Sequence, residues 1–167
     1  LLYPIDLDKY YKGADLEQLT KDYYASIGLD ITKVLNNSSL YPQEGKNQHA
    51  FCTDIDTKGD VRVLCNITEN ESWMSTMLHE FGHAVYMLGH DAANLPFALR
   101  NSAHIFTTEA IAMMMERCSS NPLWLKEFRG ISEKESQEIE ENSFKQSRLA
   151  KLVFSRWVQV VYRFEKE

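Results

Sequence analysis

Residues 71–88 read ESWMSTMLHEFGHAVYML and contain an HExxH motif, His79-Glu80-Phe81-Gly82-His83. The four-residue spacing places His79 and His83 on one face of a helix, about one turn apart, where both imidazoles can bind one metal ion. Glu80 projects about a quarter-turn away, so its carboxylate can reach a water on the metal but not comfortably the metal itself. The motif therefore predicts that two imidazoles hold Zn²⁺, which acidifies its water, and that Glu80 accepts the proton as catalytic base.

The residues around the motif have the pattern of an amphipathic helix. Thr68 and Glu71 have the spacing of a capping box at its start, and Gly89 marks its end. The apolar positions that recur around the two histidines are Met74, Met77, Leu78, Phe81, Val85 and Leu88. This context favours a metal site on a helix over a chance occurrence of the five letters.

A catalytic zinc ion needs a third protein ligand and leaves its fourth position to water. Five residues after the motif could serve, namely His90, Asp91, His104, Glu109 and Glu116. The metzincin pattern is excluded, because it requires Gly at position 86 and His at position 89, where this chain has Tyr86 and Gly89.

Glu109 is the better of these candidates, since it lies at the start of a helix predicted over residues 107–118. The loop before this helix is long enough to fold it back against the first one. Glu116 follows seven residues later on the same face and could hydrogen-bond a zinc ligand from behind. The alternative for Glu116 is an ordinary solvated carboxylate.

Elsewhere the chain is predicted to be helical, apart from one hairpin. Asp15 and Gln18 have capping-box spacing at the start of a helix that ends at Gly28. Residues 50–56 and 61–68 are predicted to be two strands around a turn at Lys58-Gly59. Ser132 and Glu135 begin a long helix, with Leu149, Val153, Val160 and Phe164 at helical spacing. The predicted fold is mainly α, a helical zincin-type catalytic subdomain with one small β-hairpin.

Composition limits the partners. The chain has 167 residues, 44% of them hydrophobic, which suits one domain spanning 1–167 or a fragment of a larger helical peptidase. A net charge of −6 without a basic cluster argues against nucleic acid or an anionic membrane as a partner. No signal peptide or membrane span is recognisable, so we expect a soluble chain of unknown compartment. Both ends look cut, so we expect the C-terminal helix to bind the remainder of a longer polypeptide or a second copy.

Three cysteines are too few for a disulfide framework, and the favoured interpretation is buried free thiols. One alternative is geometric. A two-residue turn at Lys58-Gly59 would place Cys52 opposite Cys65, at a position where a disulfide could form in an oxidising compartment.

The region of residues 47–116 resembles the gluzincin peptidyl-dipeptidases related to angiotensin-converting enzyme, with a looser likeness to the oligoendopeptidases. The resemblance lies in the HExxH motif and in two runs after it, Leu95-Pro96-Phe97-Ala98-Leu99-Arg100 and Thr108-Glu109-Ala110-Ile111. In that family an LPxxLR segment leads into an EAI segment that contains the third zinc ligand. The resemblance therefore implies Glu109 as the ligand.

Three further residues are similar to family positions, and a fourth departs from the family pattern. His49-Ala50 resembles the family's His-Ala on the cleft strand, which pairs with an extended peptide substrate. Cys65 resembles a family cysteine that closes a disulfide, although the family partner would fall near Gln48. Met113 stands where the family has an acidic residue that orients a zinc histidine, so Glu116 or a group elsewhere would have to replace it.

We therefore expect a zinc-dependent metallopeptidase that cleaves short peptides with a metal-activated water. The family's transition-state donors, a histidine and a tyrosine, cannot be assigned to any residue of this chain. The alternative is accordingly a non-catalytic zinc-binding fragment or pseudo-enzyme, because loss of one such donor can lower a rate by about 10²–10³.

Overall fold

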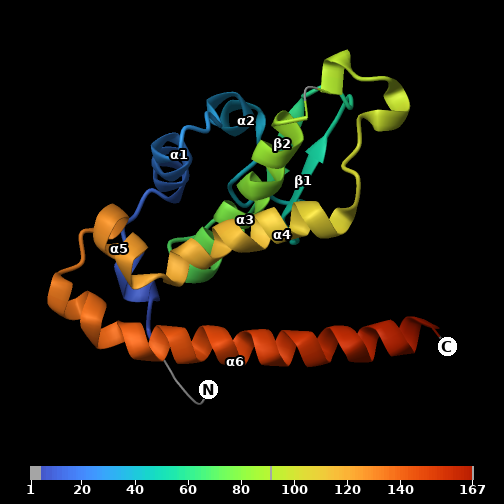
Figure 1. The fold of residues 1–167 in the computed structure, drawn as a ribbon. Helices are drawn as coiled ribbons and strands as arrows, with labels where there is room; N and C mark the ends of the chain where they lie inside the picture. The colour runs from blue at the N-terminus through green and yellow to red at the C-terminus, as the bar shows by residue number, and fades with distance from the viewer. Residues whose placement is uncertain (1–4, 91, 167) are drawn as a thin grey trace. The chain divides into compact units, whose positions relative to one another are not determined.

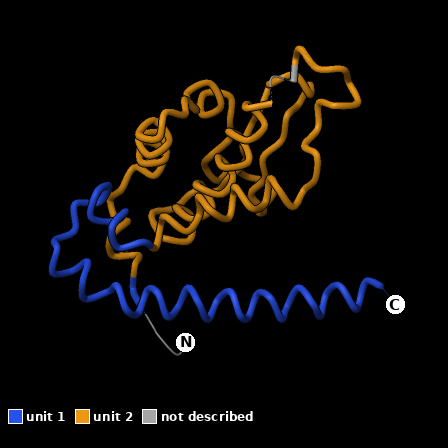
Figure 2. The backbone as a smooth tube through the Cα atoms, viewed as in Figure 1, with its two compact units in different colours: residues 1–6, 121–167 blue, residues 7–120 orange. Residues whose placement is uncertain are grey.

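A computed structural model describes residues 5–90 and 92–166 of the chain. Asp91, one of the five candidate ligands, lies outside the described residues. The chain divides into two compact units, residues 7–120 and residues 121–167 with 1–6, which Figure 2 distinguishes by colour. All other candidate site residues belong to the first unit.

The first unit contains four helices and one hairpin among its described residues. In chain order these are α1 (Leu16–Ser26), α2 (Thr32–Asn37), β1 (Phe51–Asp54), β2 (Val61–Leu64), α3 (Glu71–Leu88) and α4 (Ile105–Glu116). Short 3₁₀ turns lie at Asp8–Tyr10, Ala92–Asn94, Phe97–Leu99 and Arg117–Ser120. The predicted mainly α class with one small antiparallel hairpin is confirmed.

Helix α3 forms the centre of this unit and packs against α1, α4 and both strands (Figure 1). Its apolar face is fully buried, through Met74, Met77, Leu78, Phe81 and Ala84. From α1, the buried Tyr24 donates a hydrogen bond of 2.5 Å to the carbonyl of Leu78, the residue before His79. Burial of this face fixes which way the opposite face of α3 points, and that face carries the two histidines of the motif.

The helix starts are set by side-chain caps. Asp15 accepts from the backbone N–H of Gln18, as the sequence predicted. Helix α3 has the predicted bounds, but its N-cap is Asn70, whose side chain accepts from the N–H of Trp73. Thr68 was the wrong choice of cap, because its hydroxyl instead accepts a hydrogen bond from the Asn70 amide.

The hairpin differs from the prediction in its register. Cys52 pairs with Val63 and Asp54 with Val61, a shift of two residues from the predicted pairing. Cys52 therefore does not face Cys65, and both are free thiols. Burial raises the pKa of each thiol to about 12, so both are protonated at neutral pH.

The second unit consists of α5 (Pro122–Arg129) and α6 (Glu133–Lys166). Asn121 caps α5, and Gly130 ends it in a left-handed conformation with φ of 65°. The predicted capping box of α6 is present, since Ser132 and Glu135 exchange hydrogen bonds between side chain and backbone. Among the described residues, no helix is both long enough and apolar enough to cross a membrane.

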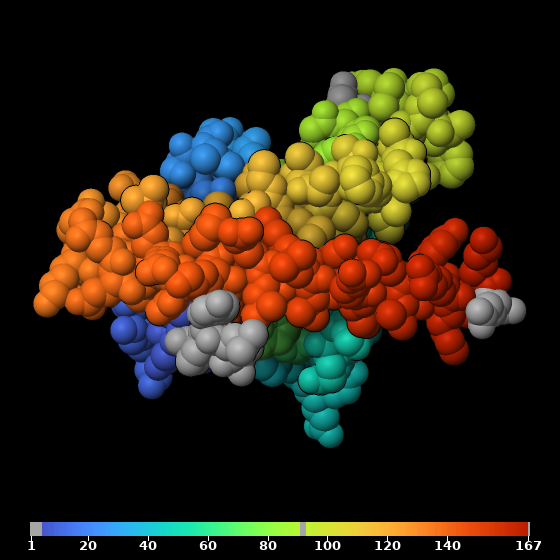
Figure 3. All heavy atoms as spheres, turned by 60° about the horizontal axis from the view of Figure 1, so that its bottom comes forward, coloured from blue at the N-terminus to red at the C-terminus, as the bar shows by residue number. Residues whose placement is uncertain are grey.

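The C-terminal half of α6, red in Figure 3, exposes large apolar side chains. One face carries Val153, Trp157, Val160 and Phe164, with exposed fractions between 59% and 81%. Their spacing of four, three and four residues places them in one stripe. Such a stripe favours association with another apolar surface.

We expect residues 1–167 to associate at high concentration, because association removes this stripe from water. Light scattering across a concentration series measures the effect. The double variant Val153→Glu and Trp157→Glu should shift the average mass toward the monomer. Gln159→Glu adds a charge to an exposed position outside the stripe and should leave the mass unchanged. A monomer at every concentration for the unchanged chain would contradict the expectation.

Candidate metal centre

Helix α3 presents the two histidines of the motif side by side. The Nε2 atoms of His79 and His83 lie 3.1 Å apart, and their rings are nearly perpendicular, with centroids 4.8 Å apart. Their side chains are 20% and 12% exposed. Two nitrogens turned toward one another at this distance suit shared coordination of one cation.

Glu109 approaches the histidine pair from α4. One carboxylate oxygen lies 3.5 Å from His79 Nε2 and the other 3.6 Å from His83 Nε2. A tetrahedral Zn²⁺ with bonds of about 2.0–2.1 Å separates its ligand atoms by roughly 3.3–3.4 Å. The three side chains also form a group whose potential ligand atoms lie within 4.8 Å of one another. Two imidazoles and one carboxylate at these distances fit Zn²⁺.

The approach of α4 to α3 depends on Gly82, one residue before His83. A Cβ atom built on Gly82 would lie 2.8 Å from the Cα of Ala112, closer than real Cβ contacts. Ala112 is itself completely buried. Only glycine at position 82 therefore allows the two backbones to come so close, and this brings Glu109 to the histidines.

Each histidine has a hydrogen-bonding partner on α4 for its other ring nitrogen. The Nδ1 atom of His79 lies 2.6 Å from a carboxylate oxygen of Glu116. The Nδ1 atom of His83 lies 2.6 Å from the hydroxyl oxygen of Thr108. Such partners fix the orientation of a metal-binding imidazole and its tautomer. The sequence analysis did not assign a role in the site to Thr108, and its position beside Glu109 was the one feature of the sequence that indicated such a role.

The far end of α4 is tied to the start of α3 by Ser119. The Ser119 hydroxyl lies 2.6 Å from a carboxylate oxygen of Glu71 and 2.9 Å from the backbone carbonyl of Glu116. Buried Tyr11 donates to the Ser119 carbonyl at 2.6 Å. These contacts hold the turn that carries Glu116, and so support the contact of Glu116 with His79.

Glu80 is buried beside the histidines, with 8% of its surface exposed. Burial raises the pKa of its carboxyl above the ordinary value, with further contributions from the charges of Glu109 and Glu116. Among the described residues, none donates a hydrogen bond to this carboxylate. Such a group suits proton transfer better than a structural ion pair.

The two histidines differ in their affinity for protons. Burial and the neighbouring His79 lower the pKa of His83. For His79, burial acts in the same downward direction, but the hydrogen bond and charge of Glu116 outweigh it, and its pKa is raised. A metal binds the neutral imidazole. Protons therefore compete with a metal more strongly at His79 than at His83.

The remaining candidate ligands lie apart from this cluster or have other partners. Glu116 uses the contact with His79 Nδ1. His90 contacts the backbone carbonyl of Tyr86 at 3.1 Å, and His104 caps α4 by accepting from Phe106 N–H. His49 and Ala50 precede β1 in an irregular segment, where His49 is exposed and its N–H bonds to Asn47.

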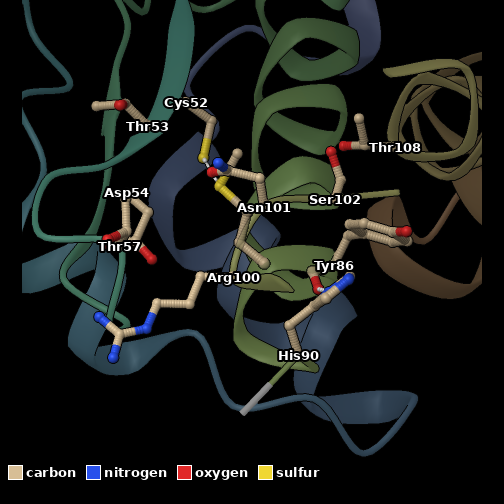
Figure 4. A pocket seen from close by; sticks show the side chains of 11 residues that line it. Cys52, Thr53, Asp54, Thr57, Tyr86, His90, Arg100, Asn101, Ser102 and Thr108 are labelled. Atoms are coloured by element: carbon tan, nitrogen blue, oxygen red, sulfur yellow. Dashed lines mark hydrogen bonds between the residues drawn. The ribbon is translucent and has the colours of Figure 1, made fainter. Parts of the chain in front are cut away.

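A cavity of about 190 Å³ lies between β1, the end of α3 and the loop before α4. Figure 4 shows its lining, which includes Cys52, Asp54, Tyr86, Arg100, Ser102 and Thr108. Thr108 therefore belongs both to the cavity and, through its contact with His83, to the histidine cluster. The cavity places polar and apolar side chains next to the candidate metal centre.

An HExxH helix with a glutamate supplied by a following helix is the arrangement of the gluzincin class of metallopeptidases. The sequence profile of the peptidase family described as angiotensin-converting enzyme matches residues 7–164. The chain belongs to this family. A comparison with curated protein sequences gave no match.

Proposed function

We propose that this chain carries the zinc centre of a peptidase that hydrolyses short peptides, with His79, His83 and Glu109 as metal ligands. The observation that supports this best is the convergence of three donor groups from α3 and α4 at the separations that Zn²⁺ requires. Three carboxylates at the site, those of Glu80, Glu109 and Glu116, add negative charge that favours a divalent cation.

Zn²⁺ bound by these residues would supply a Lewis acid that polarises the scissile carbonyl and makes water a nucleophile at neutral pH. Glu80 would accept the proton of the attacking water and pass it to the leaving amine. Its raised pKa suits the first of these steps, because a carboxyl that is harder to ionise is the stronger base once it is ionised. Glu116 would hold His79 in the orientation that keeps Nε2 toward the metal.

The substrate would lie along β1. This strand pairs with β2 on one edge, and among the described residues no strand pairs with its other edge. An extended peptide can add to such an edge through main-chain hydrogen bonds, whatever its side chains. His49 and Ala50, just ahead of the strand, would contact the peptide, and the neighbouring cavity would accept one of its side chains. Peptidyl-dipeptidase action on short peptides is the specific form that we propose.

The proposal is tested by measuring zinc content and peptide cleavage on the same preparation. We expect one zinc per chain and cleavage that stops with a chelator and returns with Zn²⁺. Glu109→Ala should lower zinc affinity more than about a hundredfold, since even outer-shell partners are worth 10–100-fold. Glu127→Ala removes an exposed carboxylate in α5 and should change neither property.

The outcomes separate the two candidate functions. Zinc binding without cleavage, in this chain and in any longer polypeptide that contains it, would rule out the peptidase and favour the non-catalytic zinc-binding alternative. Failure of the chain to bind zinc would rule out both. Cleavage that persists in metal-free protein would show that the HExxH helix does not carry the reaction.

A further inference from the structure

Thr108 is a buried hydroxyl that faces a metal-binding candidate. The residue is 7% exposed and lies in α4, one position before Glu109. Its oxygen lies 2.6 Å from His83 Nδ1, and no other hydrogen bond of this side chain is present among the described residues. In particular it does not use the carbonyl four residues earlier, which Thr20 and Thr76 both do in their helices.

Coordination through Nε2 determines what Thr108 must do. The Nε2 atom of His83 faces its counterpart on His79 and the carboxylate of Glu109. A neutral imidazole that gives this nitrogen to a metal carries its proton on Nδ1. The hydroxyl of Thr108 must then accept that proton's hydrogen bond.

We propose that Thr108 is a positioning residue that holds the His83 ring in the orientation that turns Nε2 toward the metal, and so contributes to the affinity of the site for its metal. This inference rests on the proposed zinc centre and assigns to it a residue outside the HExxH and glutamate pattern. Thr108 directly precedes Glu109, so one turn of α4 supplies a ligand and the support of another ligand.

The two histidines are supported unequally. Glu116 offers a carboxylate, which only accepts hydrogen bonds when ionised and therefore enforces a proton on His79 Nδ1. The hydroxyl of Thr108 can accept from Nδ1–H or donate to a bare Nδ1, so it tolerates either tautomer of His83. A neutral acceptor is also weaker than a charged one. Thr108 therefore makes the smaller contribution to metal affinity, and Glu116 the larger.

The cavity beside Thr108 makes a clean substitution possible. The side chain lines this space, as Figure 4 shows, and valine has nearly the shape of threonine. Thr108→Val therefore removes the hydroxyl with little change in packing. Thr108→Ser retains the hydroxyl and removes the methyl group. The adjacent Thr107 is exposed, so Thr107→Val makes the same chemical change away from His83.

The test is zinc affinity, measured by competition with a chromophoric chelator, together with the visible absorption spectrum of the Co²⁺-substituted protein. Thr108→Val should lower zinc affinity about tenfold, the lower end of the range for outer-shell partners. It should also shift the Co²⁺ bands, because the orientation of one ligand changes. Thr108→Ser should recover most of the affinity and the original spectrum, and Thr107→Val should match the unchanged chain.

Unaltered zinc affinity and Co²⁺ bands in Thr108→Val would overturn the proposal, and so would an equal loss in Thr108→Ser. If Thr108→Val does not fold, Thr108→Ala removes the same hydroxyl without adding bulk and is read in the same way. Failure of the unchanged chain to bind zinc would instead refute the proposed metal centre. If the unchanged chain binds zinc and Thr108→Val changes neither the zinc affinity nor the Co²⁺ bands, only the role of Thr108 is refuted.

Discussion

Replacing Glu80 with glutamine is expected to lower peptide hydrolysis by about 10³-fold or more while zinc stays bound. General-base catalysis by a positioned side chain contributes about 10²–10⁴-fold to a rate. The amide has the size of the carboxylate but cannot accept the proton of the attacking water. Because Glu80 donates no ligand atom to the group of His79, His83 and Glu109, the metal set is left intact. Turnover and zinc stoichiometry are measured on one sample.

Glu127→Gln is the matched control, since it makes the same substitution at an exposed position in the second unit. It should keep both full turnover and full zinc. Retained turnover in pure Glu80→Gln would exclude Glu80 as the base. Loss of zinc together with turnover would show that Glu80 supports the metal rather than the proton transfer.

The central part of the site could be predicted because it is local. His79 and His83 are separated by one helical turn, and a burial pattern with the same period fixes the direction of their face. Both facts are contained in 18 consecutive residues. The bounds of α3 agree with the prediction for the same reason, although the cap is Asn70, since several polar residues near a helix start can serve equally well in the sequence.

The partners of the histidines on α4 could be predicted only in part. Glu109 is found through its position at a helix start and through the family pattern, and Glu116 through its seven-residue spacing from Glu109. Thr108 has no periodic relation to His83, from which it is 25 residues distant in sequence. Its role depends on how α4 is rotated about its axis, and that rotation is set by packing.

The register of the hairpin was predicted wrongly because its turn is longer than expected. Asp56 accepts from the N–H groups of Lys58 and Asp60, and Thr57 adopts a positive φ of 55°. These contacts build a longer loop than the two-residue turn at Lys58-Gly59, and the register shifts accordingly. The predicted pairing of Cys52 with Cys65 depended only on the assumed length of this turn.

Helix α5 was not predicted from the sequence, and the pair Asn121-Pro122 at its start explains why. The pair Asn121-Pro122 does end the preceding turn, but Asn121 also accepts from the N–H groups of Leu123 and Trp124. Proline suits the first position of a helix because its missing N–H would be unpaired there. The same two residues therefore begin α5, which is too short for its apolar period to reveal it.

Gly82→Ala is expected to weaken both folding and metal binding, although alanine is the better helix former. Inside a helix the change alone would stabilise by about 1 kcal/mol. The new Cβ would lie 2.8 Å from Ala112 Cα, which is backbone and cannot rotate away, and 3.4 Å from Met115 Cγ. Overpacking of this kind costs about 1–3 kcal/mol. Since α4 must retreat, it carries Glu109, Thr108 and Glu116 away from the histidines.

The measurement is denaturant unfolding of the metal-free protein together with zinc affinity. Gly82→Ala should destabilise the fold by up to about 2 kcal/mol net and lower zinc affinity about tenfold, since each 1.4 kcal/mol corresponds to a factor of ten. Gly89→Ala is the control, because Gly89 has a φ of −69° and its nearest atoms lie 3.5 Å from a built Cβ. It should match or slightly exceed the stability of the unchanged chain. Native stability and zinc affinity in Gly82→Ala would mean that the close crossing of α3 and α4 does not set the geometry of the site.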